Sequence, residues 1–210
     1  TFHQQLRCIL TAFIRHVFTD EAYVQFEPST RMLWVQRSDP YAHIVPQHKH
    51  PQKVMIWLGI FYAGPTKVKL FDTSCRMNSD SYQELLEQYY LPFAEDKYGG
   101  FESCTLVQDN APAHVSKATK RRLQEWGVVV EEWPAESPDL NPVELVWAHM
   151  KQVIPSVYKP HNLQTLKDAI LAYCEEYLTL ERCQRWVDHI HEQMRACIRR
   201  KGLPVRGDKD

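Results

Sequence analysis

The sequence predicts an α/β fold in which helices pack on a central mixed five-stranded sheet. Residues 16–26 alternate between two side-chain faces with the period of two that strands show. The apolar runs 54–61 and 67–71 are joined through a Gly-Pro turn, which is a hairpin signature. Short apolar strands at 105–108 and 128–131 then alternate with helical segments, an order typical of a sheet covered by helices.

Helices are predicted from apolar stripes and from the residues at their ends. Residues 2–13 carry apolar side chains at helical spacing. Ser81 has the spacing of a capping box and opens a helix that ends near Pro92. A further helix lies between its N-cap Ser116 and its C-terminal stop Gly127.

After Pro160 the pattern becomes wholly helical. Asn162 and Thr179 are the predicted N-caps of two successive helices. We therefore divide the chain into three parts. These are a main α/β domain at 1–160, a C-terminal helical extension packed on it at 161–201, and a flexible tail at 202–210.

The composition is that of a globular protein, with 44% hydrophobic and 24% charged residues in a chain of 210. A formal net charge of −1 gives no global electrostatic sign of a nucleic-acid partner. The apolar runs are shorter than the roughly 20 residues that a membrane-spanning helix needs, so no membrane partner is predicted. Six dispersed cysteines without a Cys-x-x-Cys pair indicate a reducing compartment. The start at Thr1, without a signal pattern, is expected of an excised domain.

Three acidic residues stand in contexts unlike those of ordinary surface carboxylates. Asp20 shares the apolar face of the first predicted strand, where an isolated carboxylate is costly to bury. It therefore needs a metal ion or a salt bridge to Arg15 or Arg31, unless the register leaves this face partly solvated. Asp109 follows a strand, and there it either makes an Asx-turn or faces a ligand at the end of the sheet.

Glu144 occupies the third position of a predicted helix, with Asn141 as N-cap and Pro142 at the first position. Its carboxylate either completes a capping box with Asn141 or reaches a metal between the helix and the sheet. Together with Asp20 and Asp109 it supplies the oxygen ligands that two hard cations prefer. Two such ions support attack on a phosphodiester, because one activates the nucleophile while the other stabilises the departing oxygen.

Three segments resemble the catalytic motifs of Tc1/mariner-family transposases: FTDE at 18–21, QDNAPAH at 108–114 and WPAESPDLNPVELVW at 133–147. The resemblance covers roughly residues 16–151. The 34 residues between Asp109 and Glu144 agree with the DD34E pattern of that family. The resemblance implies an RNase H-like fold, with residues 1–160 as a DDE catalytic domain.

The resemblance also implies an activity, that of a DNA endonuclease and strand transferase with two Mg²⁺ ions, for which Mn²⁺ substitutes. Asp20, Asp109 and Glu144 would be both the catalytic residues and the metal ligands, with Asp20 bridging the two ions. Asn110 and His114 match further motif positions and would orient the site or touch DNA.

The resemblance implies that the partners are transposon ends and target DNA in the nucleus. It also implies that the full-length protein could form a homodimer. Relatives carry N-terminal helix-turn-helix modules that read the transposon ends, so we expect this chain alone to lack sequence-specific end recognition. Residues 28–53 lie where relatives place a loop used in subunit contact.

A basic helix face is the local candidate for DNA contact. Lys117, Lys120 and Arg121 share this face and would neutralise phosphates, while an ordinary solvated helix face is the alternative. His189 and His191, with nearby cysteines, invite a zinc hypothesis. At about 100° per residue these side chains scatter around a helix, so no zinc site is predicted.

Two other functions remain open. A host protein derived from such a transposase would keep the fold as a DNA- or protein-binding module with weak or no catalysis. An RNase H-type nuclease would instead cut the RNA of an RNA–DNA hybrid. Metal-dependent nicking of DNA that requires the three carboxylates separates the transposase from both.

Overall fold

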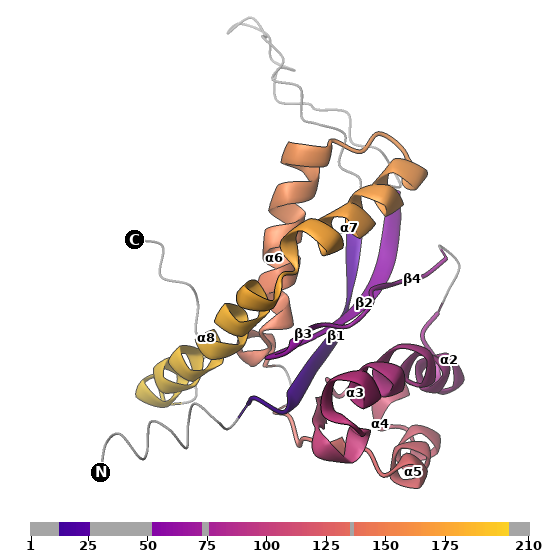
Figure 1. The fold of residues 1–210 in the computed structure, drawn as a ribbon, viewed down its shortest axis with the longest axis vertical. Coiled ribbons are helices and arrows are strands. Elements are labelled where there is room, and N and C mark those ends of the chain that lie inside the picture. The colour runs from indigo at the N-terminus through magenta and orange to yellow at the C-terminus, as the bar shows by residue number, and fades with distance from the viewer. Residues whose placement is uncertain (1–12, 26–51, 73–75, 135–136, 202–210) are drawn as a thin grey trace, which may run out of the picture.

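The protein is described from a computed structural model that covers residues 13–25, 52–72, 76–134 and 137–201. A mixed sheet with strand order β3-β2-β1-β5-β6 lies at its centre, and β4 also pairs with β2 (Figure 1). Strands β1 and β2 are antiparallel, whereas β5 runs parallel to β1 and β6 runs parallel to β5. The bounds of these four strands are His16–Gln25, Lys53–Phe61, Thr105–Val107 and Val129–Val130.

The strand predicted at 67–71 is shorter than expected, and a further short strand lies in the predicted Gly-Pro turn, so the sheet has six strands where five were predicted. Both β3 (Gly64–Pro65) and β4 (Lys69–Leu70) pair with β2 in the antiparallel sense. Between them, the Thr66 hydroxyl accepts a hydrogen bond from the Gly59 amide at 2.9 Å. The Thr66 amide also donates to the Gly59 carbonyl at 2.8 Å, so Thr66 is joined to β2 by one backbone and one side-chain hydrogen bond. The predicted hairpin is confirmed, and its partner strand is discontinuous.

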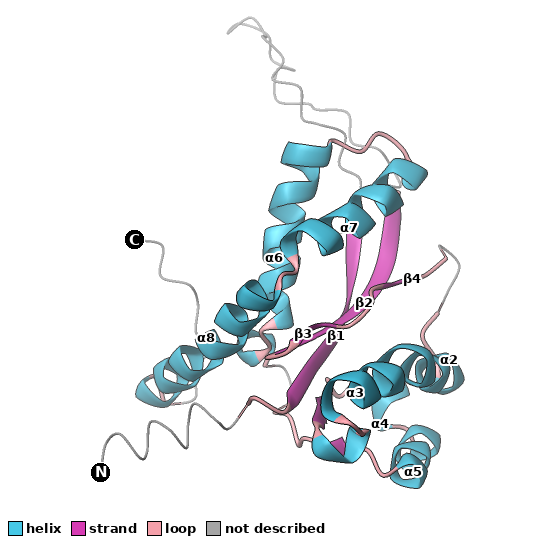
Figure 2. Cartoon of the chain, in the orientation of Figure 1, coloured by secondary structure: helices cyan, strands magenta, loops and turns pink. Residues whose placement is uncertain are grey.

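One face of the sheet is covered by α2, α3, α4 and α5 (Figures 1 and 2). A continuous helical segment is formed by α2, a π-helix and α3, and it is followed by the short α4 and by α5. Their bounds are Ser79–Leu85, Leu86–Tyr90, Leu91–Tyr98, Pro112–Val115 and Lys117–Trp126. The predicted ends of α5 are confirmed, because Ser116 caps it and Gly127 ends it with φ 73°.

The predicted ends of the α2 segment are wrong. Asn78, not Ser81, is the N-cap, and its side chain accepts hydrogen bonds from the amides of Asp80 and Ser81. Ser81 is the third helical residue of that capping box. The helical segment also continues beyond Pro92, which follows the π-helix Leu86–Tyr90 directly and is the second residue of α3.

The other face of the sheet is covered by α6, α7 and α8 (Figure 1). Their bounds are Val143–Val153, Leu163–Tyr177 and Leu180–Arg199, and a π-helix at Ile154–Tyr158 follows α6. The predicted caps Asn162 and Thr179 are confirmed. Buried side chains of α7 and α8 share one cluster with Phe18 and Ile56 of the sheet. Residues 161–201 therefore form part of the layer that covers the sheet, while the division at residue 160 remains a prediction.

Several predictions fall on residues that the structure does not describe. The helix at 2–13, most of the loop at 28–53 and the tail at 202–210 lie outside the described residues, as does Arg31. Within the described ranges, no helix combines the length and the apolar character that crossing a membrane requires.

Candidate active site

The first two carboxylates lie at corresponding places on neighbouring parallel strands. In the register of β1 and β5, Phe18 pairs with Val107. Asp20 and Asp109 each follow two residues later, so both lie toward the same edge of the sheet. β1 continues to Gln25, whereas β5 ends at Val107 and the chain turns away. The carboxyl ends of strands in open α/β sheets are the usual ligand sites.

The N-terminal part of α6 is anchored to β1 beside Asp20. The indole Nε1 of Trp147 donates a hydrogen bond to Asp20 Oδ2 at 2.8 Å. The side-chain amide of Asn141 donates to the carbonyl oxygen of Thr19 at 3.4 Å. Glu144 lies three residues before Trp147 and therefore on the same helix face. These contacts place Glu144 on the side of α6 that faces Asp20.

The predicted capping box of α6 is wrong. The helix begins at Val143, and the Asn141 side chain accepts a hydrogen bond from the Val143 amide at 3.2 Å. Among the described residues, the Glu144 carboxylate makes no reciprocal bond to Asn141. An Asx-type turn at Asn141 is sufficient to start the helix before Pro142 and Val143. The structure therefore excludes the capping-box role of Glu144, and its role as a metal ligand stays a prediction.

Asp20 is an acid in an environment that disfavours its charge. Burial raises its pKa to about 7, and the nearby carboxylates of Glu21 and Glu144 act in the same direction, while the Trp147 hydrogen bond opposes them. Arg15, one of its two predicted salt-bridge partners, forms no ion pair with it. Burial also raises the pKa of Glu144. Two facing carboxyls with raised pKa values make a donor set that suits a divalent cation.

Asp109 makes the Asx-turn that its position predicted. Its Oδ1 accepts a hydrogen bond from the Ala111 amide at 2.9 Å and is also 2.6 Å from Nδ1 of His114. The bond with His114 is the main cause that lowers the pKa of the Asp109 carboxyl. Asp109 is therefore ionised and fixed by its turn, which is compatible with a ligand role.

His114 lies between two carboxylates. Its Nε2 is 3.3 Å from Oε1 of Glu21, and its side chain is only 3% exposed. Burial lowers the pKa of His114, but the carboxylates of Asp109 and Glu21 outweigh that effect and raise it to about 9. The sequence interpretation missed Glu21, although its alternation placed Glu21 on the face opposite Asp20. That face also carries the polar residues Thr19 and Gln25, so no local signal marked Glu21.

The three carboxylates divide into two groups. The charge of Glu144 contributes to the raised pKa of Asp20, whereas Asp109 bonds to His114. Among the described residues, no three His, Cys, Asp or Glu side chains stand close enough to hold one ion together. Carboxylates are suitable ligands for a divalent metal ion. For Asp20 and Asp109 to bind the same ion, their side chains would have to move closer together.

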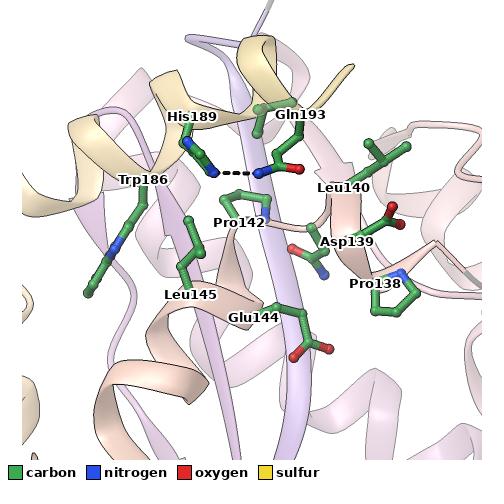
Figure 3. Close-up of a pocket in the computed structure, with 11 residues that line it drawn as sticks. Pro138, Asp139, Leu140, Pro142, Glu144, Leu145, Trp186, His189 and Gln193 are labelled. Atoms are coloured by element: carbon green, nitrogen blue, oxygen red, sulfur yellow. Dashed lines mark hydrogen bonds between the residues drawn. The ribbon is translucent and has the colours of Figure 1, made fainter. Parts of the chain in front are cut away.

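Glu144 and Asp109 line separate hollows. Glu144 borders one of about 320 Å³ together with Asp139, Trp186 and His189. Figure 3 shows its carboxylate pointing away from the hydrogen bond between Gln193 and His189. The other residues along this hollow are Pro138, Leu140, Asn141, Pro142, Leu145 and Ile190.

Asp109 borders a hollow of about 470 Å³ that also contains Asn110, His114 and Lys120. The Asn110 side chain donates to the Trp133 carbonyl at 3.1 Å, so it ties the turn to the following segment. Of the predicted DNA-contacting cations, Lys120 is the one that lines this hollow. Arg121 is exposed on α5 and lies 3.7 Å from Glu125, while Lys117 is exposed near the start of the helix.

Comparison with known proteins agrees with this fold and shows the family of the chain. A family model described as DDE superfamily endonuclease matches residues 15–167. The transposable element Tcb2 transposase of Caenorhabditis briggsae is 30% identical over 196 residues, which cover 91% of this chain and 70% of that protein. The chain therefore belongs to the DDE superfamily endonucleases and, within them, to the Tc1/mariner transposases.

Solved structures confirm the expected RNase H-like fold. The Mos1 transposase paired-end complex with left transposon end has a TM-score of 0.80 at 20% identity. The match covers 98% of this chain and 61% of the Mos1 chain. The catalytic domain of Mos1 mariner transposase gives 0.74 at 18% identity and covers 98% and 91% of the two chains. This chain thus shares the fold of the Mos1 catalytic domain and spans 61% of the chain in the paired-end complex.

Proposed function

We propose that the chain performs the DNA cleavage and strand transfer of a Tc1/mariner-type transposase, with Asp20, Asp109 and Glu144 as its catalytic residues. The observation that carries the proposal is the Asp20 carboxyl. It is largely buried, faces Glu144, and has no cationic partner in the described part of the chain. A carboxylate kept in such a place is compensated when a cation binds.

The three carboxylates are the proposed ligands of Mg²⁺, with Mn²⁺ as a substitute, and two ions are expected once DNA is bound. The Mos1 transposase has been solved in paired-end complexes with Mn and with Mg. When bound, such ions activate the attacking water or 3′-hydroxyl and stabilise the departing oxygen. Asp20 is positioned for this task by Trp147, and Asp109 by its turn and by His114.

DNA is the proposed substrate, at transposon ends and at the target, which requires action in the nucleus. Lys120 borders the hollow that contains Asp109 and is placed to neutralise a phosphate near the cut. Lys117 and Arg121 extend the basic face of α5 along the proposed DNA path. The Mos1 paired-end complexes support a homodimer of the full-length protein. Residues 1–160 and 161–201 are the proposed catalytic domain and its helical extension.

A plasmid-nicking assay tests the proposal. We expect the 210-residue chain to convert supercoiled DNA to nicked circles in the presence of Mg²⁺ or Mn²⁺. EDTA should lower the rate by about 10³-fold or more, because metal stabilisation of the transition state supplies several kcal/mol. Equal rates with and without EDTA would contradict the proposal. Absence of nicking under every metal condition would favour a binding module, and preference for an RNA–DNA hybrid would favour an RNase H-type nuclease.

A further inference from the structure

A carboxylate–histidine–carboxylate chain crosses the edge of the sheet behind the candidate site. Its members are Glu21 on β1, His114 on α4 and Asp109 after β5, and Glu21 lies far in the sequence from the other two, which are five residues apart. The Nδ1 atom of His114 is 2.6 Å from Asp109, and its Nε2 is 3.3 Å from Glu21. The Nδ1 contact is a hydrogen bond, whereas Nε2 and Glu21 Oε1 lie within ion-pair distance without forming one, so the imidazole stands between the two carboxylates.

Further contacts hold the His114 side chain and the His114 backbone in place. The Tyr82 ring packs against it, with centroids 3.9 Å apart and an interplanar angle of 32°. The Tyr82 hydroxyl donates to Gln108 Oε1 at 2.6 Å, and Gln108 Nε2 donates to the His114 carbonyl at 3.4 Å. Tyr82, Gln108 and His114 are all buried. The His114 ring is therefore held in one orientation between the two carboxylates.

The hydrogen bonds of Asp109 involve only one of its two carboxylate oxygens. Both the Ala111 amide and His114 bind Oδ1, and Oδ2 makes no hydrogen bond to any other described residue. The Asp109 side chain is 56% exposed, so Oδ2 is accessible to an incoming ligand. In known metal sites, residues that hydrogen-bond to a metal ligand fix its orientation. His114 can act in this way, because it binds one oxygen of Asp109 and leaves the other accessible.

We propose that Glu21 is a positioning residue that acts through His114 to fix the Asp109 carboxylate with Oδ2 turned toward the metal. This inference rests on the proposed function. It goes beyond it by assigning a role to Glu21, which contributes no metal ligand. If Glu21 only stabilised the fold, its loss would lower thermal stability and leave the metal affinity of the folded protein unchanged.

The test is a double-mutant cycle on Mn²⁺ affinity, measured from the EPR signal of free Mn²⁺ with the 210-residue chain and Mn²⁺ alone. Glu21→Gln preserves the shape of the side chain and removes its charge. His114→Asn keeps a short donor near Asp109 but does not reach Glu21. Each single variant should weaken Mn²⁺ binding by about tenfold. The double variant should be no weaker than His114→Asn alone, because Glu21 acts only through the ring.

Controls separate this inference from the proposed function. Asp168→Asn alters an exposed carboxylate on α7, which accepts a hydrogen bond from Gln164, and should leave Mn²⁺ affinity within about twofold. Asp109→Asn should weaken binding strongly, and its failure to do so would overturn the proposed function itself. If Asp109→Asn weakens binding while Glu21→Gln does not, or if the two single effects add, only the role of Glu21 is overturned. Thermal melts of every variant verify that the folded protein is compared.

Discussion

Asp20→Asn is expected to abolish metal-dependent nicking while it stabilises the fold. The substitution removes the charge at the centre of the proposed metal site, and a loss of about 10³-fold or more in nicking rate should follow. The asparagine side chain keeps an oxygen that accepts the Trp147 hydrogen bond, which is 2.8 Å long in the wild type. The two effects therefore have opposite signs.

The gain in stability depends on pH. In the folded state the pKa of Asp20 is raised to about 7 from 3.8, so the folded protein binds more protons than the unfolded chain between these values. Wild-type stability from this group is therefore present below the unfolded pKa and falls as pH rises through about 7. At pH 8 the ionised Asp20 costs on the order of a few kcal/mol, and Asp20→Asn should recover that amount. The gain should be less than half as large at pH 5, because only part of the interval between the two pKa values has then been crossed.

Chemical denaturation at pH 5 and pH 8, with nicking assays on the same preparations, measures both effects. Mn²⁺ should reduce the difference in stability at pH 8, because it binds the folded wild type and compensates its charge. Asp168→Asn on α7 is a matched control, since this exposed carboxylate accepts a hydrogen bond from Gln164 away from the site. It should change neither property. An active Asp20→Asn variant would contradict the assignment of Asp20.

Truncation after Pro160 is expected to prevent stable folding. It removes α7 and α8, whose buried side chains share a core with the sheet residues Ile56, Leu58 and Ile60. Exposing these three side chains alone costs about 5–9 kcal/mol. That amount is comparable with the whole stability of a typical domain. The predicted extension at 161–201 would then be required for the domain at 1–160.

Three chain lengths test this expectation. Residues 1–160 should elute as an expanded or aggregated species and show no cooperative thermal transition. Residues 1–201, which lose only the nine-residue tail, should unfold like the 210-residue chain. A cooperative transition for residues 1–160 would instead establish an independent domain ending near Pro160.

Local signals in the sequence predicted the regular elements well where one residue had no competitor. Ser116, Asn162 and Thr179 cap their helices as predicted, because each stands alone before an apolar helical pattern. Ser81 failed because Asn78, three residues earlier, offers a better oxygen to the same turn. Local spacing cannot rank two such candidates when the start of the helix is set by packing.

The sequence was sufficient to predict which acidic residues form the candidate site. It was not sufficient to predict which side chains they contact. Alternation along the first strand placed Asp20 with the apolar side chains, and the structure puts it among them. Its partner Trp147 is 127 residues away in the sequence, so no local pattern connects the two. The same holds for Glu21 and His114, which meet only because β1 and α4 are neighbours in the fold.

Anomalous diffraction from crystals soaked in Mn²⁺ tests the central claim most directly. The account predicts a Mn²⁺ peak about 2 Å from an Asp20 oxygen, with Glu144 or Asp109 supplying a second ligand. Oδ2 should be the oxygen that Asp109 presents. Mn²⁺ bound elsewhere, with the Asp20 carboxylate still held only by Trp147, would contradict the account.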